Sequence, residues 1–448
     1  MMATRPLPWI RLAQAVLQLA LAGGFCCGVA GAQIPGSVGL PGAISVPKQI
    51  PDRPSVRSSL PPEFAIPVER LGFSAPGPIY LGQRYRFASL DFLDENRLLF
   101  TFRVPGLIRR EFGDSGDSDE HKIRAVVLSL PEGTVQAEAL WTLHDRLRYL
   151  WMLKDGHFLL RDGRGLQLGN SGLDLKPFLS FPGPLLSLEM DPAQQFLVTN
   201  SREPIPADAN AGGSQGPATS SSAGGPDDPA KAGKAEIAVR VLRRDSGKVM
   251  LVSRVRTPVH LPINAEGYLE SLRSRGSEWL VNLNYFTGGS TEVGRVESSC
   301  TPDFEFVSQR EVLGSVCNDM GSAGLVALTA GGRRLWRVPD PPRQIWPMQV
   351  MGSNGTRFVR ETLFVAHSID AYSPLDQEDV KGQVVTVQDS ADGKVELLAE
   401  ASPVLDAGGN VAISPSGRRV AVLDAGAIQI YTLPEPPPLQ DGETKAGR

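Results

Sequence analysis

Short apolar runs separated by polar turns recur along most of the chain. Each run of about four to seven apolar or β-branched residues is followed by a turn and by another such run. The turns LPEG, KDG, RDSG, SADG and SPSG supply the Gly and Asp residues that tight hairpins need at positive φ. Long amphipathic helical patterns are absent from the sequence. The alternation therefore predicts an all-β domain of antiparallel strands.

One layout is repeated within these hairpins. A turn motif followed by an apolar strand occurs at residues 93–100, 190–198 and 413–422. Repeats of roughly 40 to 50 residues, each built from four short strands, are typical of β-propeller blades. About seven such blades fit best between the two ends of this region, and six or eight also fit. We therefore predict a single β-propeller whose blades contain four antiparallel strands each.

The last predicted blade of the chain lacks its fourth strand. Residues 411–414, 420–423 and 428–433 are expected to form three strands of one blade. The PEPPPLQ segment that follows cannot supply a fourth strand, because proline has no N–H for the ladder. We predict that an N-terminal strand at residues 79–87 pairs with residues 428–433 and closes the ring.

The segment VAISPSGRRVAV, at residues 411–422, resembles a hairpin of a known kind. In WD-repeat-like and YVTN-type bacterial β-propellers, a Ser-Pro-Asp-Gly-Lys turn lies between two apolar runs. The likeness is clear here and partial in the copies that begin at Leu185 and Ser89, and the Gly-His and Trp-Asp dipeptides of true WD repeats are missing. The resemblance implies the propeller architecture.

The N-terminus has the pattern of a secretory signal peptide. Arg5 and Arg11 precede a long apolar stretch, which ends in the small residues 30–32. This order predicts a signal peptide at residues 1–32 and export to the periplasm or the extracellular space. An uncleaved anchor is the alternative, because the apolar run approaches spanning length. Cys26 and Cys27 are not preceded by the residues of a lipobox, so lipidation is disfavoured.

Segments rich in proline, glycine and serine divide the rest of the chain. Residues 33–78 have a proline every few positions and are expected to form an extended spacer. Residues 203–235 contain almost no bulky apolar side chain, which predicts a disordered insertion within the propeller of residues 79–434. Residues 435–448 are predicted to be a disordered tail. The GxSxG match at 212–216 has no strand before it and no helix after it, so it is not a nucleophile elbow.

The charge balance narrows the class of partner. With 45 Lys and Arg against 49 Asp and Glu, the formal net charge is -4. This balance gives no electrostatic reason to expect nucleic acid or an anionic membrane surface as a partner. After signal cleavage we expect a monomer without stable membrane insertion, whose partner is an unknown protein or glycan.

Two cysteines remain after cleavage of the signal peptide, Cys300 and Cys317. They flank two runs of alternating apolar residues that could lie side by side, so a disulfide is compatible with the geometry. Two buried thiols are the alternative. The spacing does not suit zinc, and no CxxC or HExxH motif occurs.

No catalytic or cofactor-binding residue and no cofactor is identified from the sequence. The histidines occur singly, so structural or surface roles are expected of His121, His144, His157, His260 and His367. An acidic loop has carboxylates that suit Ca²⁺, but it lacks the EF-hand alternation, so a solvated loop is the better interpretation of Asp114, Asp117, Asp119 and Glu120. The large aromatic residues are expected to lie in the core, namely Trp141, Tyr149, Trp151, Trp336 and Trp346.

Loops around the mouth of the central channel are the usual functional surface of a propeller. The sequence therefore favours a secreted or periplasmic module that binds or scaffolds a protein or glycan. The first alternative is an enzyme of the lactonase, quinoprotein or lyase type, which would need acidic or histidine side chains from several blades to converge on the channel. The second is a cell-surface structural component tethered by the proline-rich segment.

Overall fold

The computed structural model divides the chain into two compact units, residues 1–51 and residues 52–448. All residues that the structure describes belong to the second unit. No helix among them is long and apolar enough to cross a membrane. The described residues are 58–76, 86–106, 120–144, 147–204, 235–317, 323–341, 343–351, 355–367, 377–405 and 407–435.

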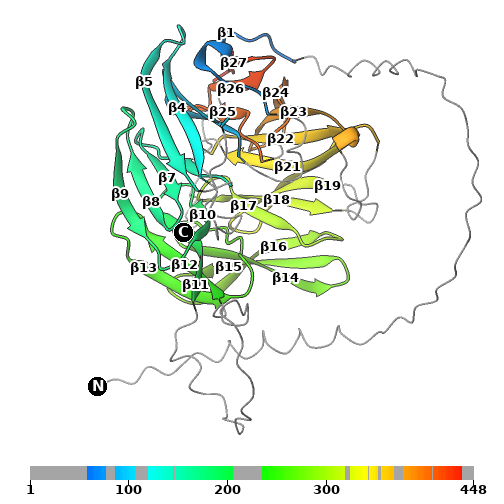
Figure 1. The fold of residues 1–448 in the computed structure, drawn as a ribbon. Coiled ribbons are helices and arrows are strands. Elements are labelled where there is room, and N and C mark those ends of the chain that lie inside the picture. Colours follow the sequence, from blue (N-terminus) through cyan, green and yellow to red (C-terminus); the bar gives the residue numbers. More distant parts are fainter. Residues whose placement is uncertain are drawn as a thin grey trace, which may run out of the picture. The chain divides into compact units, whose positions relative to one another are not determined.

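The described residues form seven antiparallel sheets, which follow one another around a common centre (Figure 1). Six of these sheets have four strands and one has three. The chain is a seven-bladed β-propeller. The all-β prediction and the predicted number of blades are confirmed.

In each sheet the strands follow one another from the inner edge outward. The first sheet has β2 (Ala88–Asp94), β3 (Arg97–Arg103), β4 (His121–Ser129) and β5 (Val135–Leu143), and the second has β6 (Leu150–Met152), β7 (Phe158–Asp162), β8 (Gly165–Gly169) and β9 (Leu175–Ser180). The third has β10 (Leu185–Met190), β11 (Phe196–Pro204), β12 (Ala235–Arg243) and β13 (Val249–Val255), and the fourth has β14 (Gly267–Arg275), β15 (Glu278–Tyr285) and β16 (Ser290–Glu297). The fifth has β17 (Asp303–Phe306), β18 (Glu311–Cys317), β19 (Ala323–Thr329) and β20 (Arg334–Pro339), and the sixth has β21 (Gln344–Met351), β22 (Arg357–Val365), β23 (Val380–Asp389) and β24 (Val395–Ala401). The seventh has β25 (Val411–Ile413), β26 (Arg419–Asp424), β27 (Ala427–Thr432) and β1 (Phe64–Pro67).

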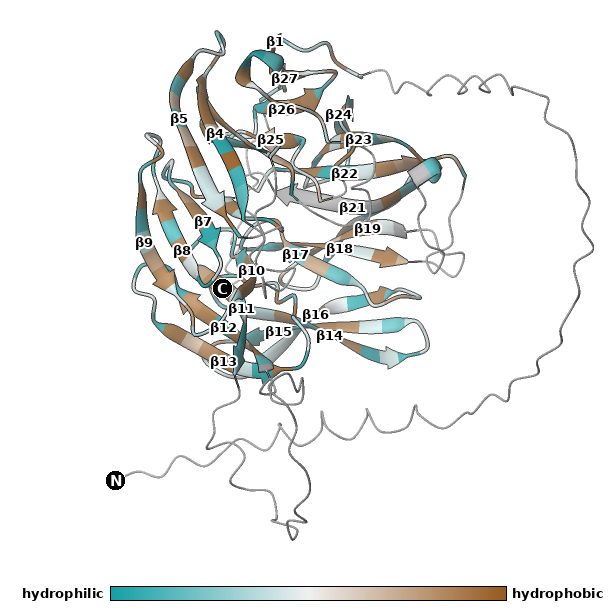
Figure 2. Ribbon diagram, viewed as in Figure 1, coloured by the Kyte–Doolittle hydropathy of each residue, from teal (hydrophilic) through white to brown (hydrophobic). Residues whose placement is uncertain are grey.

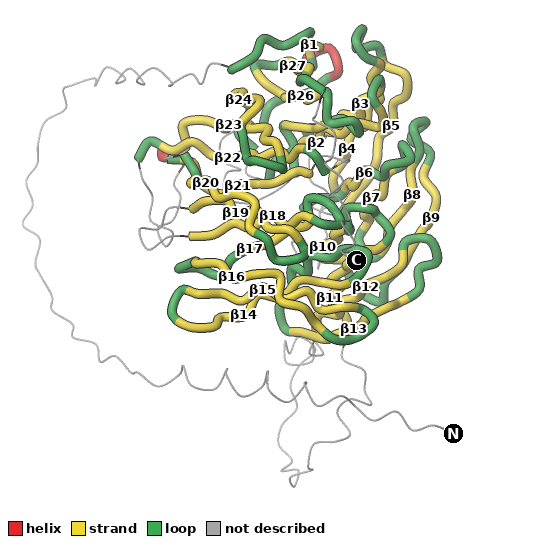
Figure 3. The backbone as a smooth tube through the Cα atoms, turned by 180° about the vertical axis from the view of Figure 1, so that it is seen from behind, coloured by secondary structure: helices red, strands yellow, loops and turns green. Residues whose placement is uncertain are grey.

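Tight turns join most of these strands, as the sequence predicts. Gly393 in SADG and Gly417 in SPSG have φ of 73° and 74°, values that are strained for any residue with a Cβ. Figure 3 shows the strands with short loops between them and two helical turns, the 3-10 turns Glu69–Leu71 and Gln377–Asp379. Hydrophobic segments are interspersed with polar ones along the strands (Figure 2).

The core lies between neighbouring sheets. In β26, Val420 and Val422 pack into a core shared with the sixth sheet, while Ala421 and Leu423 pack into a core shared with the first sheet. All four side chains are fully buried. The apolar run of β26 is thus covered on both faces by adjacent blades.

The outer strand of the seventh sheet comes from a different segment than predicted. Strand β1 pairs antiparallel with β27, with Phe64 opposite Ile430 and Ile66 opposite Ile428. The prediction that residues 79–87 pair with β27 was therefore wrong, since β1 occupies that edge; residues 79–85 lie outside the described part of the chain. A four-residue outer strand tolerates a terminal proline such as Pro67, because only one of its edges is hydrogen-bonded. Strand β1 lies within the range 33–78 that the sequence predicts as a spacer.

The fourth sheet departs from the predicted four strands. Residues 260–264 occupy its inner position. They pair with the sheet through an isolated β-bridge between Ile263 and Tyr268. The backbone N–H groups of Asn264 and Leu269 donate to the carbonyls of Gly267 and Pro262. Because Pro262 has no N–H to donate, a regular ladder does not form there. This irregular inner segment forms part of the site described below.

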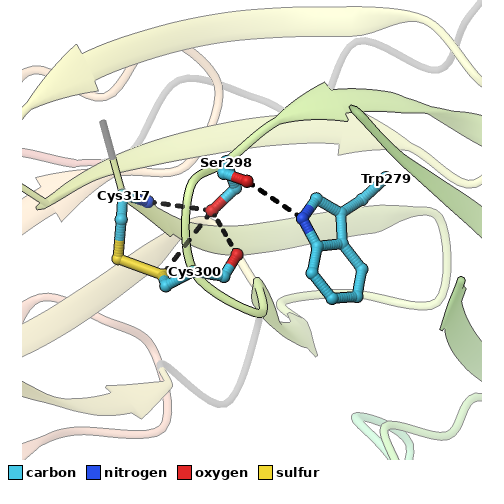
Figure 4. The surroundings of a disulfide bond; sticks show 4 residues. All are labelled: Trp279, Ser298, Cys300 and Cys317. Atoms are coloured by element: carbon cyan, nitrogen blue, oxygen red, sulfur yellow. Dashed lines mark hydrogen bonds between the residues drawn. A yellow bond between two sulfur atoms is a disulfide. The ribbon is translucent and has the colours of Figure 1, made fainter. Parts of the chain in front are cut away.

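A disulfide joins the fourth and fifth sheets (Figure 4). Cys300 lies between β16 and β17, Cys317 ends β18, and their Cα atoms are 5.5 Å apart. The Ser298 hydroxyl accepts the N–H of Cys317 at 3.0 Å and donates to the carbonyl of Cys300 at 2.7 Å. The indole N–H of Trp279 donates to the Ser298 carbonyl at 3.0 Å. The bond and its polar neighbours therefore fix the connection between the two blades.

Candidate functional site

A cavity of about 290 Å³ lies where the inner edges of the sheets meet. It is lined by the inner strands β2, β6, β10, β17 and β25 and by the irregular segment 260–264. Six of the seven blades thus contribute to its wall, which places it on the propeller axis. We call this space the axial cavity.

One wall of the axial cavity is an acidic group centred on His260. Its Nδ1 lies 3.0 Å from a carboxylate oxygen of Glu189 on β10, and its Nε2 lies 3.4 Å from one of Asp303 on β17. Nε2 also lies 2.9 Å from the Phe304 carbonyl. Because both ring nitrogens face acceptors, the doubly protonated ring is favoured. Burial alone would lower the pKa of His260, but Glu189 and then Asp303 outweigh it and raise that pKa to about 10.

Glu305 lies beside this group on β17. Burial raises the pKa of Glu305 to about 7, against the opposing attraction of His260. Among the described residues, no side chain forms an ion pair or hydrogen bond with its carboxylate. Glu305 therefore presents to the axial cavity a carboxyl group that no direct contact holds.

Arg148 and Trp151 form the opposite wall, in the second blade. The guanidinium carbon of Arg148 lies 5.4 Å from the centre of the Trp151 ring, and its Nε donates to the Leu150 carbonyl at 3.1 Å. The terminal nitrogens have no partner among the described residues. Burial among the blades lowers the pKa of Arg148 to about 10, so the side chain is still a cation at neutral pH. It is open to the solvent of the cavity although protein surrounds it.

Asp91 on β2 lies near this cation. Its carboxylate accepts the hydroxyl of Ser89 at 2.6 Å. Burial raises the pKa of Asp91, while Ser89 and the charges of Arg86 and Arg148 act in the opposite direction. The Arg86 guanidinium itself donates to the Ala407 carbonyl at 2.6 Å. Asp91 thus moderates the positive charge of this wall without forming an ion pair with Arg148.

Asp191 also lines the axial cavity, but its carboxylate is fully used by the fold. It accepts the backbone N–H groups of Ala193 at 3.0 Å and Phe196 at 2.7 Å. The Gln309 side chain donates to it at 3.0 Å. Asp191 therefore fixes the β10–β11 turn. Arg148 and Glu305 are available to a ligand from opposite walls, and Lys154 also lines the cavity.

No protein-family model matches the chain, and no curated protein matches it in sequence. Similar solved structures include the acylaminoacyl peptidase of Pyrococcus horikoshii, at 10% identity and a TM-score of 0.44 over 78% of this chain and 52% of that chain. The chain thus spans about half the length of that peptidase. TolB from Acinetobacter baumannii matches at 12% identity and a TM-score of 0.35, over 75% of this chain and 80% of that one. Kluyveromyces lactis Hsv2p matches at 10% identity and a TM-score of 0.34, over 64% of this chain and 75% of that one. These values say nothing about activity.

The other histidines lie apart from the axial cavity. His144, His157 and His367 form pairs with Asp162, Asp155 and Asp379, at 3.5, 3.3 and 3.6 Å respectively. His121 is buried beside Arg103. Within the described residues, no group of three or more His, Cys, Asp or Glu side chains is arranged to hold a metal ion. In the His260 group, the ring separates Glu189 from Asp303, so the three do not face one point.

The acidic loop of the sequence prediction falls largely outside the described residues. This applies to Asp114, Asp117 and Asp119, whereas Glu120 pairs with Lys122 at 2.8 Å. The role predicted for this loop therefore stays a prediction.

The expectation of core positions is confirmed for most of the large aromatic residues. Trp141, Tyr149 and Trp151 are buried, and the Tyr149 hydroxyl lies 2.8 Å from that of Thr101. Trp336 is half-buried and stacks on the Phe358 ring with 6.1 Å between centroids. The side chain of Trp346 lies outside the described part of the structure. Trp151 combines a core position with a place in the cavity wall.

Sequence reasoning missed the convergence of these ionisable residues. A signal was present, because three inner strands place a carboxylate between two apolar residues. These are Leu90-Asp91-Phe92, Leu188-Glu189-Met190 and Phe304-Glu305-Phe306. The apolar neighbours pack into the cores between blades, so the acid is held at the inner edge. A short strand interrupted by one carboxylate thus indicates an axis-lining position.

The His260 group predicts a pH-dependent stability. The folded pKa of about 10 exceeds the ordinary value of 6.5, so the stabilisation is full below pH 6.5 and is lost as the pH rises to 10. The His260 side chain is 36% exposed, so solvent screening limits the effect to about 1 kcal/mol. We expect the difference in free energy of unfolding between the wild type and His260→Gln to shrink from pH 6 to pH 10. Urea denaturation at several pH values measures this, and a constant difference would contradict it.

Proposed function

We propose that this chain is an exported binding module that recognises its ligand at the axial cavity. The observation that carries the proposal is the pair Arg148 and Glu305, which line one space on the propeller axis. The terminal nitrogens of Arg148 and the carboxylate oxygens of Glu305 have no hydrogen-bond or ion-pair partner among the described residues. Ionisable groups that line one pocket with perturbed pKa values and unused hydrogen-bonding atoms are typical of a binding site. The signal-peptide pattern of residues 1–32 supports export. The resemblance of residues 411–422 to WD-repeat-like and YVTN-type propellers supports a role in binding a protein or glycan.

An enzyme with its site at the axial cavity is the second candidate. The notable observation is Glu305, because a pKa of about 7 suits a group that both accepts and donates protons at neutral pH. The neighbouring Glu189, His260 and Asp303 supply further acidic and basic groups. Turnover of a ligand once it is identified, and its loss in Glu305→Gln, would distinguish this enzyme from a binding module.

Ligand-induced stabilisation tests the proposed binding. The full chain is heated with separate panels of sugars and glycan fragments, amino acids and short peptides, organic acids and polyamines. A ligand at 100 times its Kd stabilises the folded state by about 2.7 kcal/mol and should raise Tm by several degrees. Ile413→Trp fills the axial cavity and should abolish the shift, whereas Val252→Trp, on the exposed outer strand β13, should not. If no class shifts the wild type in this cavity-dependent way, the proposal fails.

A further inference from the structure

Arg148 and Glu305 lie on opposite walls of the axial cavity, and neither forms an ion pair among the described residues. Arg148 belongs to the segment before β6, in the second blade, and Glu305 belongs to β17, in the fifth blade. Each is close enough for its charge to act on the other. No ion pair joins them among the described residues, so cavity space separates the guanidinium from the carboxylate.

Each charged group is oriented by its neighbours and remains available. The Leu150 carbonyl and the Trp151 ring hold the Arg148 guanidinium by its Nε and one face, which leaves the terminal N–H groups for an oxyanion. Glu305 adjoins the group of Glu189, His260 and Asp303, in which His260 neutralises one of the two neighbouring acids. This wall therefore keeps an excess of negative charge and favours a cation.

Apolar side chains line much of the remaining surface of the axial cavity. They come from several blades and include Phe92, Trp151, Met152, Leu188 and Phe306. At about 290 Å³, the cavity lies at the lower limit of ligand pockets, which span roughly 300 to 1,000 Å³. The space therefore suits a small molecule with an apolar part between two charged ends.

We infer that the ligand of the axial cavity is a small zwitterion with one carboxylate and one ammonium group, an apolar α-amino acid or a short peptide. The inference rests on the proposed binding at this cavity. The carboxylate meets the terminal N–H groups of Arg148, and the ammonium group meets Glu305. The apolar side chain packs against Trp151 and its apolar neighbours.

Other ligand classes satisfy only part of this surface. A simple anion leaves Glu305 without a counter-charge, and a simple cation does the same to Arg148. A neutral sugar displaces cavity water from both groups without supplying either charge, which carries a desolvation cost. A ligand with both charges compensates both walls at once.

Titration calorimetry on the full chain tests the inference with four probes. Leucine and the dipeptide Leu-Leu carry both charges, N-acetyl-leucine lacks the ammonium group, and leucinamide lacks the carboxylate. We expect at least one of the two zwitterions to bind and the blocked compounds to bind at least tenfold more weakly. This comparison uses the wild type alone, so it does not depend on the folding of any variant.

Variants then assign each charge to its wall. Arg148→Gln should weaken the zwitterion at least tenfold and leave leucinamide unaffected, whereas Glu305→Gln should weaken the zwitterion equally and leave N-acetyl-leucine unaffected. Matched controls are Arg164→Gln and Glu132→Gln, at exposed positions in turns away from the axial cavity, which should bind like the wild type.

The outcomes separate this inference from the proposed function. Equal affinity for the blocked and the free compounds overturns the zwitterion. Cavity-dependent stabilisation by another class in the panels, with no binding of leucine or Leu-Leu, also overturns it and leaves the proposed binding in place. Failure of every class overturns both.

Discussion

Replacing Arg357 by Ala is expected to lower the free energy of unfolding by about 3–5 kcal/mol. The side chain is 1% exposed and lies at the start of β22. Its guanidinium forms a two-point ion pair with Glu396 on β24. It also donates to the carbonyl of Gly417 at 2.9 Å and to that of Pro434 at 2.7 Å. One cation thus joins the sixth blade to the seventh.

The cost is large because the partners stay behind. Without the guanidinium, a partly buried carboxylate at Glu396 and two carbonyls lose their donors. Urea denaturation measures the loss as a lower midpoint. Arg418→Ala is the matched control, since Arg418 is exposed in the β25–β26 turn beside Gly417 and should change the midpoint little. A similar midpoint for both variants would show that Arg357 does not join the blades.

Removing the disulfide in Cys300→Ser/Cys317→Ser is expected to cost about 3 kcal/mol of unfolding free energy. The bond closes a loop with a sequence separation of 17, which limits the freedom of the unfolded chain. It also holds the Ser298 hydroxyl, which contacts both cysteine backbones. The loss should fall on the connection between the fourth and fifth sheets.

Chemical denaturation with and without reductant measures this effect. Reductant should lower the urea midpoint of the oxidised wild type and leave the double variant unchanged. Trp279 gives a local signal, because its indole N–H is bonded to the Ser298 carbonyl, so its fluorescence should change on reduction. A wild-type midpoint that does not respond once the thiols are shown to be free would contradict the prediction.

Much of the fold follows from local pattern in the sequence. Hairpin turns with glycine at positive φ, such as SPSG at Gly417, mark strand ends within a few residues, and the apolar run 420–423 indicates burial on both faces. The partner of β27 could not be read in this way. A four-residue strand next to prolines has no distinctive period, and its pairing is decided by edges that are distant in sequence.

The axial cavity could not be predicted from the sequence for a related reason. Asp91, Arg148, Glu189, His260 and Glu305 belong to five different blades. The pattern of single carboxylates between apolar residues marks inner-edge positions one strand at a time, but not which of them meet. The closure of the ring brings these residues together, and their spacing along the chain does not indicate that they meet. His260 in particular was expected to have a structural or surface role, because it occurs singly in the sequence. Its two acidic partners lie far away in the chain, on β10 and β17.

The seventh sheet combines a strand from the start of the propeller with three strands from its end, so it is completed last. Its outer strand β1 is made first and its other three strands last, and a contact between Glu63 and Thr432 spans 369 positions. This sheet therefore stays incomplete until nearly the whole propeller has been synthesised, whereas the other six are assembled from consecutive strands. Non-local pairing of this kind is slow because a long loop must close first. Until β1 is in place, the exposed edge of β27 is open to pairing with another copy of the chain.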